Sequence, residues 1–386
     1  MEFSNYVFET NDILFNLTTK VSLPKDASKK QLEENFFLKG QEQQAINHVL
    51  FDIDESKGLT LFINPTWQCN LRCKHCFVLD KLVKKDNEEL NVGDLVKFVK
   101  AYKNKYPKIE KVKVVFVGGE VALVTDKCLE VAYRLKNIDL DFDFSLTTNG
   151  TILDDKFIEL IGLCSYFIVS LDGNEQSNNE QRKSLENINP FECTMNNIKE
   201  LVRLGNREKM LVSAALNDDI LKNKEILVSF YSQLLMAGVL KKNINVGSIV
   251  PQPRFEEINN TFKFFFENGY FTRPCCKYRG GRLFFIDNHN KVYCDYFQDY
   301  SKSLLGSLTD QIDVIVENHK NVIRKQMPVL NDDKCKTCPV LGVCWGRCCN
   351  FTMKKPSEIC DQTTLISVVH KDCLENNLLK KIFKHK

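Results

Sequence analysis

The sequence lacks three features that mark common classes of protein: an excess of one charge, a long apolar run and a signal segment. Its 386 residues carry 53 Lys and Arg against 50 Asp and Glu, a formal net charge of only +3. This small surplus argues against nucleic acid or an anionic membrane as the main partner. The start, MEFSNYVFET, has no basic segment followed by an apolar run, and no later segment approaches about eighteen uninterrupted apolar residues. We therefore expect a cytoplasmic protein.

Cysteine, in contrast, is abundant, with 16 residues. A reducing compartment disfavours a disulfide framework, and thiolates are good ligands for iron and zinc. The cysteines gather in two fields, within residues 69–76 and within residues 275–373. Cys128, Cys164 and Cys193 stand alone in apolar or helical segments, and we expect them to be ordinary core or surface residues.

Between residues 59 and 250 short apolar runs alternate with longer amphipathic ones. The apolar runs predict buried parallel strands, and the amphipathic segments predict helices, one of which Asn91 could cap. Six strand–helix repeats predict an α/β protein whose parallel sheet is either doubly wound or curled into a partial barrel. The predicted strands are residues 59–66, 112–120, 141–150, 166–173, 210–217 and 244–250.

The chain on either side of this region has a different pattern. The first 58 residues alternate like a hairpin and then like a helix, and the cysteine-rich end contains a second hairpin pattern at residues 282–297. Within the central region, the polar tract 174–189 predicts a loop. We predict three domains, which are residues 1–58, 59–255 and 256–386.

Cys69, Cys73 and Cys76 form a C-x3-C-x2-C motif that the aromatic Phe77 follows directly. The motif comes after the first predicted strand, and functional loops of such sheets gather at the carboxyl ends of the strands. Three thiolates leave one iron of a 4Fe-4S cluster open to a small molecule. The alternative is a zinc ion whose fourth ligand is His75 or a remote cysteine.

This motif resembles the signature of the radical S-adenosylmethionine enzymes, which are iron-sulfur oxidoreductases. The resemblance implies a partial (β/α)6 TIM-like barrel in which S-adenosyl-L-methionine (SAM) binds the open iron through its amino and carboxylate groups. It also implies that a glycine-rich turn after the second strand, Gly118, Gly119 and Glu120, contacts the amino group. Taken alone, this GGE sequence is also compatible with a plain turn.

Three more polar residues match cofactor-binding positions of the family. Asn149 and Ser170 match positions that face the ribose or carboxylate of the cofactor, and Ser213 at the fifth strand is a further candidate. Asp172 and Gly173 complete an SLDG signature seen in one large subgroup. The alternative is that these polar side chains cap helices or satisfy the ends of strands.

The second cysteine field is similar to the SPASM domain, which carries two auxiliary 4Fe-4S clusters. By this resemblance the outer cluster has the ligands Cys335, Cys338, Cys344 and Cys360. The inner cluster has the ligands Cys294, Cys348 and one or both of Cys275 and Cys276. Cys349 and Cys373 are alternatives for its fourth ligand, and His289 stands where the family pattern has a glycine. Zinc knuckles are the competing interpretation of the whole field.

The resemblance implies that an electron donor such as flavodoxin or ferredoxin drives the cleavage of SAM to a 5'-deoxyadenosyl radical, which takes a hydrogen atom from the substrate. Asp295 matches an aspartate proposed as the substrate base in anaerobic sulfatase-maturing relatives, and a turn aspartate is the alternative. The N-terminal segment resembles the start of peptide maturases. It could pair with a leader peptide by strand addition, or only cover the open side of the barrel.

Three functions follow as hypotheses. The first is a radical SAM maturase that installs a thioether or carbon-carbon crosslink in a ribosomally made precursor peptide (RiPP maturation). The second is an anaerobic sulfatase-maturing enzyme that oxidises cysteine or serine to formylglycine. The third, from another class, is a zinc-binding scaffold without turnover.

Overall fold

A computed structural model describes most of the chain up to residue 339. The described residues are 2–9, 13–16, 18–19, 21–52, 58–83, 85, 87–216, 223–248, 282–294, 303–326 and 332–339. They form two compact units, one from residues up to 53 and from 318 on, and the other from residues 54–274 and 282–317. The domain boundaries predicted above stay predictions.

The larger unit is built on a nine-stranded sheet with the order β11-β10-β8-β7-β6-β4-β12-β13-β14. The first six strands in this order run parallel to their neighbours, which confirms the predicted α/β sheet. They are β4 (Gly58–Ile63), β6 (Lys111–Phe116), β7 (Asp141–Thr148), β8 (Cys164–Ser170), β10 (Met210–Leu216) and β11 (Ile244–Ser248). The partial TIM-like barrel expected from the sequence is consistent with this arrangement.

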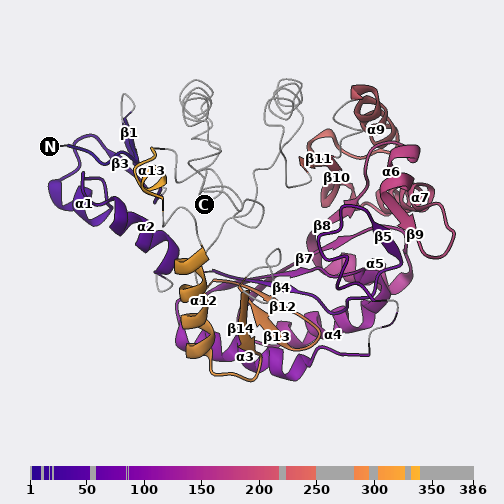
Figure 1. The fold of residues 1–386 in the computed structure, drawn as a ribbon, viewed down its shortest axis with the longest axis horizontal. Coiled ribbons are helices and arrows are strands. Elements are labelled where there is room, and N and C mark those ends of the chain that lie inside the picture. Colours follow the sequence, from indigo (N-terminus) through magenta and orange to yellow (C-terminus); the bar gives the residue numbers. More distant parts are fainter. Residues whose placement is uncertain are drawn as a thin grey trace. The chain divides into compact units, whose positions relative to one another are not determined.

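Helices connect the parallel strands, and Figure 1 shows α3 and α4 on the outer side of β4 and β7. The Asn91 side chain accepts a hydrogen bond from Asp94 N and caps α3, as predicted. No helix in the described part of the chain is long and apolar enough to cross a membrane. The helices are α3 (Val92–Lys105), α4 (Thr125–Lys136), α5 (Asp155–Leu163), α6 (Glu175–Gln181), α7 (Pro190–Arg203) and α9 (Lys224–Met236), with 3-10 turns η1 (Val121–Val124), η2 (Asn206–Glu208) and η3 (Lys241–Asn243).

Both faces of the central strands are covered. In β4 every second residue is fully buried, ending with Leu61 and Ile63. From the opposite face, Phe62 packs against a buried cluster that includes Val115 and Trp67. Since burial on two faces leaves the strand ends as the accessible edge, the loops that follow the strands carry the polar chemistry.

The prediction of a loop at residues 174–189 is wrong. These residues form α6 and the short strand β9 (Arg182–Ser184) before α7 begins. The Asn174 side chain caps α6 by accepting a hydrogen bond from Ser177 N, and Asn178 Oδ1 accepts one from Asp172 N at 3.0 Å. The tract is polar because its side chains bond to backbone groups, and not because the segment is solvated throughout.

The hairpin predicted near residue 290 is confirmed for its described part. Strand β12 (Leu283–Ile286) pairs antiparallel with β13 (Lys291–Tyr293), which pairs with β14 (Leu304–Ser307). β12 also pairs in parallel with β4, so the hairpin extends the central sheet. The first predicted strand therefore has a neighbour on each side.

The smaller unit begins with an antiparallel sheet and two helices, where the sequence predicted a hairpin and one helix. The sheet has the order β1-β2-β3, with β1 (Val7–Glu9), β2 (Ile13–Asn16) and β3 (Val21–Pro24). The helical segment divides into α1 (Lys29–Glu34) and α2 (Glu42–Phe51), because α1 ends at its C-cap Asn35 and the next residue, Phe36, has a φ of 60°, outside the helical range. Further on lie α12 (Ile312–Gln326), whose second half belongs to this unit, and α13 (Asp333–Lys336).

His319 of α12 makes the stability of the smaller unit depend on pH. The side chain is buried, and burial lowers the pKa of its imidazole to about 3. The unfolded chain takes up this proton near pH 6.5, whereas the folded chain does not, so stability is complete above that pH and falls as the pH drops toward 3. We expect wild type to lose about 1.4 kcal/mol between pH 7.5 and 5.5 from this group. Denaturant unfolding of wild type and His319→Gln at both pH values tests this, and an equal loss in the two proteins contradicts it.

Candidate functional site

The three cysteines of the first field lie on the loop that follows β4. Cys69 precedes strand β5 (Leu71–Cys73), Cys73 ends it, and Cys76 lies in the turn after it. All three are partly buried free thiols. The Cys76 side chain packs against the apolar cluster of the sheet interior. The motif therefore stands at the carboxyl end of the first parallel strand, as predicted.

Strand β9 holds the cysteine loop in place. β5 pairs antiparallel with β9, and the register sets Cys73 opposite Arg182. Two more backbone hydrogen bonds extend this contact, from Lys74 N to Gln181 O at 2.8 Å and from Leu185 N to Asn70 O at 3.0 Å. The segment that sequence reasoning assigned to a loop is thus a support for the predicted ligands.

The two glycines of the GGE turn are required by their contact with the same loop. Gly118 has a φ of +151°, and a Cβ on it would lie 2.3 Å from Asn64 Oδ1. A Cβ on Gly119 would lie 1.9 Å from the carbonyl oxygen of Gln68. The backbones are joined there by Gly119 N donating to Thr66 O at 3.0 Å. Only glycine allows so close an approach of these two chain segments.

Glu120, which the resemblance assigned to the cofactor, is only 1% exposed and has three hydrogen-bond donors within the protein. Its carboxylate accepts from Ala122 N at 3.0 Å, Thr148 Oγ1 at 2.6 Å and Asn149 N at 2.7 Å. Burial raises the pKa of this carboxyl, and the hydrogen bonds oppose that rise. In this arrangement Glu120 ties the GGE turn to the end of β7, and its contact with a cofactor stays a prediction.

Asn149 connects the end of β7 to the cysteine loop. Its Nδ2 donates to Asn70 Oδ1 at 2.8 Å, and its Oδ1 accepts from Thr151 N at 2.9 Å. Asn70 Nδ2 in turn donates to Thr151 Oγ1 at 2.9 Å. Asn70, which stands directly after the first cysteine, was not a candidate from the sequence. The predicted residues Cys69, Glu120 and Asn149 are thus linked. Asn149 hydrogen-bonds both Glu120 and Asn70, and Asn70 directly follows Cys69 in the sequence.

Ser170 and Ser213 lie side by side on neighbouring strands. They are paired in the register of β8 and β10, Ser170 as the last residue of β8 and Ser213 in the middle of β10, and both are partly buried. Asn245 Nδ2 donates to Ser213 Oγ at 3.2 Å. Their roles toward a cofactor stay predictions.

Asp172 of the SLDG sequence forms a buried ion pair that the sequence did not predict. Its carboxylate is fully buried and accepts from Arg182 Nε at 2.7 Å and from Ala215 N at 2.8 Å. His75 Nε2 lies 3.4 Å from the same carboxylate. Arg182 was overlooked because it stands inside the polar tract 174–189, with Gln181 and Lys183 beside it.

Of the second cysteine field, three residues are described. Cys294 directly follows β13 and is buried, Cys335 lies in α13, and Cys338 lies after it. The remaining predicted ligands and the predicted base lie outside the described residues; they are Cys275, Cys276, Cys344, Cys348, Cys360 and Asp295. Cys128 and Cys164 are buried in the core, as expected for ordinary interior residues.

The first cysteine loop fits a metal cluster by its donors. Burial raises the pKa of Cys69 to about 12 and of Cys73 to about 11, so bound iron would supply the positive charge that stabilises thiolates at these positions. Two buried polar atoms near the loop, Asn64 Nδ2 and His75 Nδ1, have no hydrogen-bond partner among the described residues. Such atoms are available to a ligand.

A single zinc ion fits the same loop less well. Among the described residues, no three Cys, His, Asp or Glu side chains are grouped closely enough to hold one metal ion. Each iron of a 4Fe-4S cluster takes one thiolate, so its three cysteines need not converge on one point. His75 Nε2 is directed to Asp172, so only Nδ1 would remain for a metal.

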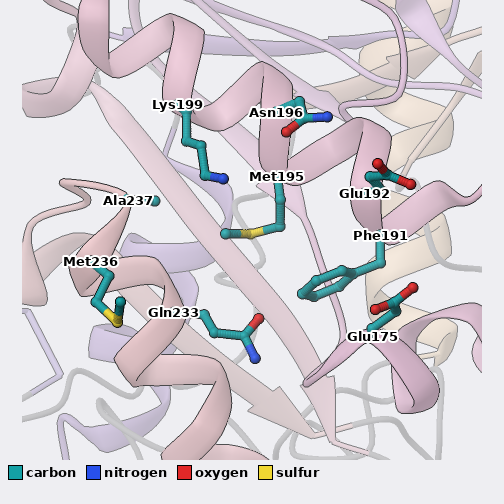
Figure 2. A pocket seen from close by; sticks show the side chains of 9 residues that line it. All are labelled: Glu175, Phe191, Glu192, Met195, Asn196, Lys199, Gln233, Met236 and Ala237. Carbon is teal, nitrogen blue, oxygen red and sulfur yellow. The ribbon is translucent and has the colours of Figure 1, made fainter.

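An open pocket of ≈ 750 Å³ lies elsewhere in the larger unit. Figure 2 shows its wall, with Phe191, Met195 and Lys199 on α7 and Gln233 and Met236 on α9. None of the residues predicted to bind a cofactor or metal lines it. The pocket is an open hollow between helices, and none of its lining residues belongs to the cysteine loop.

The central part of the chain is similar in sequence to known proteins. Residues 63–217 match the radical SAM superfamily. The chain is 29% identical over 144 residues to GTP 3',8-cyclase of Alkaliphilus oremlandii (strain OhILAs), covering 37% of this chain and 43% of that protein. It is 28% identical over 156 residues to the cysteine-type anaerobic sulfatase-maturating enzyme of Clostridium novyi (strain NT), covering 38% and 41%. The chain thus spans about two fifths of the length of the curated relatives it matches.

Solved structures share the fold. Native anSMEcpe with bound AdoMet and Cp18Cys peptide gives a TM-score of 0.64 at 17% identity, covering 84% of this chain and 99% of that chain. Streptococcus suis SuiB bound to the precursor peptide SuiA gives 0.54 at 13% identity, covering 92% and 99%. At these identities the likeness concerns the fold. The family match, the parallel sheet and the cysteine loop after its first strand agree, and residues 63–217 of this chain are a radical SAM domain.

Proposed function

We propose that this chain is a radical SAM maturase that takes a hydrogen atom from a ribosomally made peptide and installs a thioether or carbon-carbon crosslink. The observation that carries the proposal is the cysteine loop, which projects three thiols from the carboxyl end of β4 and is bound on both sides by β9 and the GGE turn. Cys69, Cys73 and Cys76 would hold the cluster. When bound, the cluster and SAM supply a carbon radical that removes a substrate hydrogen atom.

In this proposal the residues around the loop hold it in place or bind the cofactor. Gly119 and Asn149 fix the loop to the ends of β6 and β7 through backbone and amide hydrogen bonds. Ser170 at the end of β8 and Ser213 within β10 offer hydroxyl groups to the polar parts of the cofactor. The cysteines of the second field would bind two auxiliary clusters, so anaerobically purified protein should contain about twelve iron atoms per chain.

A peptide substrate is supported by two observations. The neighbours of similar fold include complexes with a Cp18Cys peptide and with the precursor peptide SuiA. In the smaller unit, β1 and β3 are the edge strands of the three-stranded sheet within the described residues. An edge strand can accept an extended peptide as a further strand, which would hold the leader of a precursor while its other end is modified.

Formylglycine formation on a sulfatase is a second candidate. It is favoured by the 28% identity to the enzyme of Clostridium novyi and by the TM-score of 0.64 to anSMEcpe. In that reaction Asp295 would act as the base that takes a substrate proton. The two candidates share the radical step and differ in the product, so the product decides between them.

The experiment is a co-expression under anaerobic conditions of this chain with a short cysteine-containing reading frame from its genetic neighbourhood. The crosslinking proposal predicts a peptide that has lost two hydrogens and shows no aldehyde. A thioether also abolishes the reaction of the cysteine with iodoacetamide, whereas a carbon-carbon crosslink leaves that reaction intact. Formylglycine formation predicts instead a product that reacts with a hydrazide probe. Co-expression with the Cys69→Ala variant is the control, and loss of two hydrogens that persists with it contradicts radical chemistry at this loop.

A further inference from the structure

A buried arginine links β9, which supports the cysteine loop, to the segment that follows β8. Arg182 of β9 is 8% exposed, and its partner Asp172 at the end of β8 is fully buried. Nε and Nη2 of the guanidinium donate to the two carboxylate oxygens at 2.7 and 3.1 Å. Because a planar fork bound to a carboxylate by two parallel bonds has a fixed orientation, the third nitrogen also has a fixed direction.

That third nitrogen points at a predicted cluster ligand. Arg182 Nη1 lies 3.8 Å from Cys73 Sγ, within hydrogen-bonding range for sulfur. The β5–β9 register sets the two residues opposite each other, so the contact is built into the strand pairing. Asp172 is itself held by Ala215 N at 2.8 Å, which anchors the pair to β10. The Arg182 contact therefore rests on the two-stranded β5–β9 sheet and on β10 of the large sheet.

We infer that Arg182 is a positioning residue that donates an N–H group to the Cys73 sulfur and thereby raises the reduction potential of the cluster bound there. The inference rests on the proposed function, because it requires Cys73 to be a cluster ligand. Adding an electron increases the negative charge on the ligating sulfurs, so a hydrogen bond to one of them stabilises the reduced cluster more than the oxidised one. The reduction potential of the cluster that must pass an electron to SAM is thus raised by a residue of the polar tract 174–189.

Asp172 has a separate part in this arrangement. A buried guanidinium without a carboxylate would be strongly unfavourable, so Asp172 makes the position of Arg182 possible. Its carboxylate also offsets much of the guanidinium charge. What acts on the Cys73 sulfur is therefore the directed N–H···S hydrogen bond rather than the attraction of a full positive charge. Removing Asp172 alone would leave a buried unpaired charge, which makes the single variant a poor probe.

The variants are chosen to separate the contact with sulfur from folding. Arg182→Lys keeps a positive charge for Asp172 but cannot reach both the carboxylate and the sulfur in the same geometry. The double variant Asp172→Asn with Arg182→Gln removes both charges together and leaves a neutral amide pair. Arg203→Gln is the matched control, because Arg203 is an exposed arginine on α7 that pairs with Glu200.

The test is a redox titration of the anaerobically reconstituted full-length chain, followed by electron paramagnetic resonance. The signal that Cys69→Ala removes is assigned to the first cluster. In Arg182→Lys and in the double variant we expect the ratio of reduced to oxidised cluster at a fixed potential to fall about tenfold, which is about 59 mV for a one-electron couple. Arg203→Gln should keep the wild-type value.

A second readout compares wild type with Arg182→Lys. Exchange into deuterium oxide should shift the iron–thiolate stretching bands of the first cluster in resonance Raman spectra more in wild type than in Arg182→Lys, because Leu71 N donates to Cys69 Sγ in both proteins and Arg182 adds a donor at Cys73 only in wild type. A wild-type midpoint in both variants at full iron content, or equal deuterium shifts in wild type and Arg182→Lys, overturns the inference while the proposed function stands. A wild-type chain that takes up no cluster at the first cysteine loop overturns both.

Discussion

Replacing Cys73 by alanine is expected to remove about four iron atoms per chain and to reduce the formation of 5'-deoxyadenosine to background. Only two thiolates would then remain on the loop, and a 4Fe-4S cluster with an open iron needs three. Cys73 ends the strand that pairs with β9, so its loss removes the sulfur at the best-supported point of the loop. Iron and sulfide analysis with a reductant-driven SAM cleavage assay measures both effects.

Cys193→Ala is the matched control for this variant. Cys193 is a partly buried free thiol of α7 and has no part in the predicted cysteine fields. Its replacement should leave iron content and SAM cleavage at the wild-type level. Equal iron content in Cys73→Ala and wild type would contradict the assignment of the first loop as a cluster site.

Gly119→Ala is expected to destabilise the larger unit by about 3 kcal/mol and to lower iron uptake. The new Cβ would lie 1.9 Å from Gln68 O and 2.5 Å from Gln68 C, which are backbone atoms that a rotamer change cannot move away. The loop that carries Cys69 must therefore shift, and the hydrogen bond from Gly119 N to Thr66 O is lost with it. Denaturant unfolding and iron analysis of the reconstituted protein measure the two consequences.

Gly162→Ala provides the comparison. Gly162 lies in α5, and a Cβ there would meet no atom within 4 Å. Alanine is the better helix former, so this variant should be more stable than wild type by about 0.5 kcal/mol and should bind iron normally. If Gly119→Ala unfolds like Gly162→Ala and takes up full iron, the close contact between the GGE turn and the cysteine loop has no energetic importance.

The main features of the fold could be predicted because they depend on local patterns. Apolar runs at regular intervals correspond to the six parallel strands, and Asn91 caps a helix that begins where the amphipathic pattern begins. The ends of the strands could then be identified, and with them the position of the cysteine loop. Burial on both faces of a sheet leaves a strong signal in the sequence.

The support of the site could not be predicted in the same way. Asn70 and Arg182 act through partners that are 79 and 109 residues away, Asn149 and Cys73 respectively, and no local pattern records such pairings. The polar tract was misinterpreted because composition does not distinguish a solvated side chain from one that bonds a buried backbone group. The glycines of the GGE turn were recognised, but their contact with the Gln68 backbone depends on tertiary structure.

The most direct test of the central claim is electron-nuclear double resonance on the reduced first cluster with SAM that carries 15N in its amino group. The account predicts a 15N coupling that shows the amino group bound to the iron which Cys69, Cys73 and Cys76 leave open. The absence of this coupling, together with a protein nitrogen or sulfur as a fourth ligand of the cluster, would contradict it.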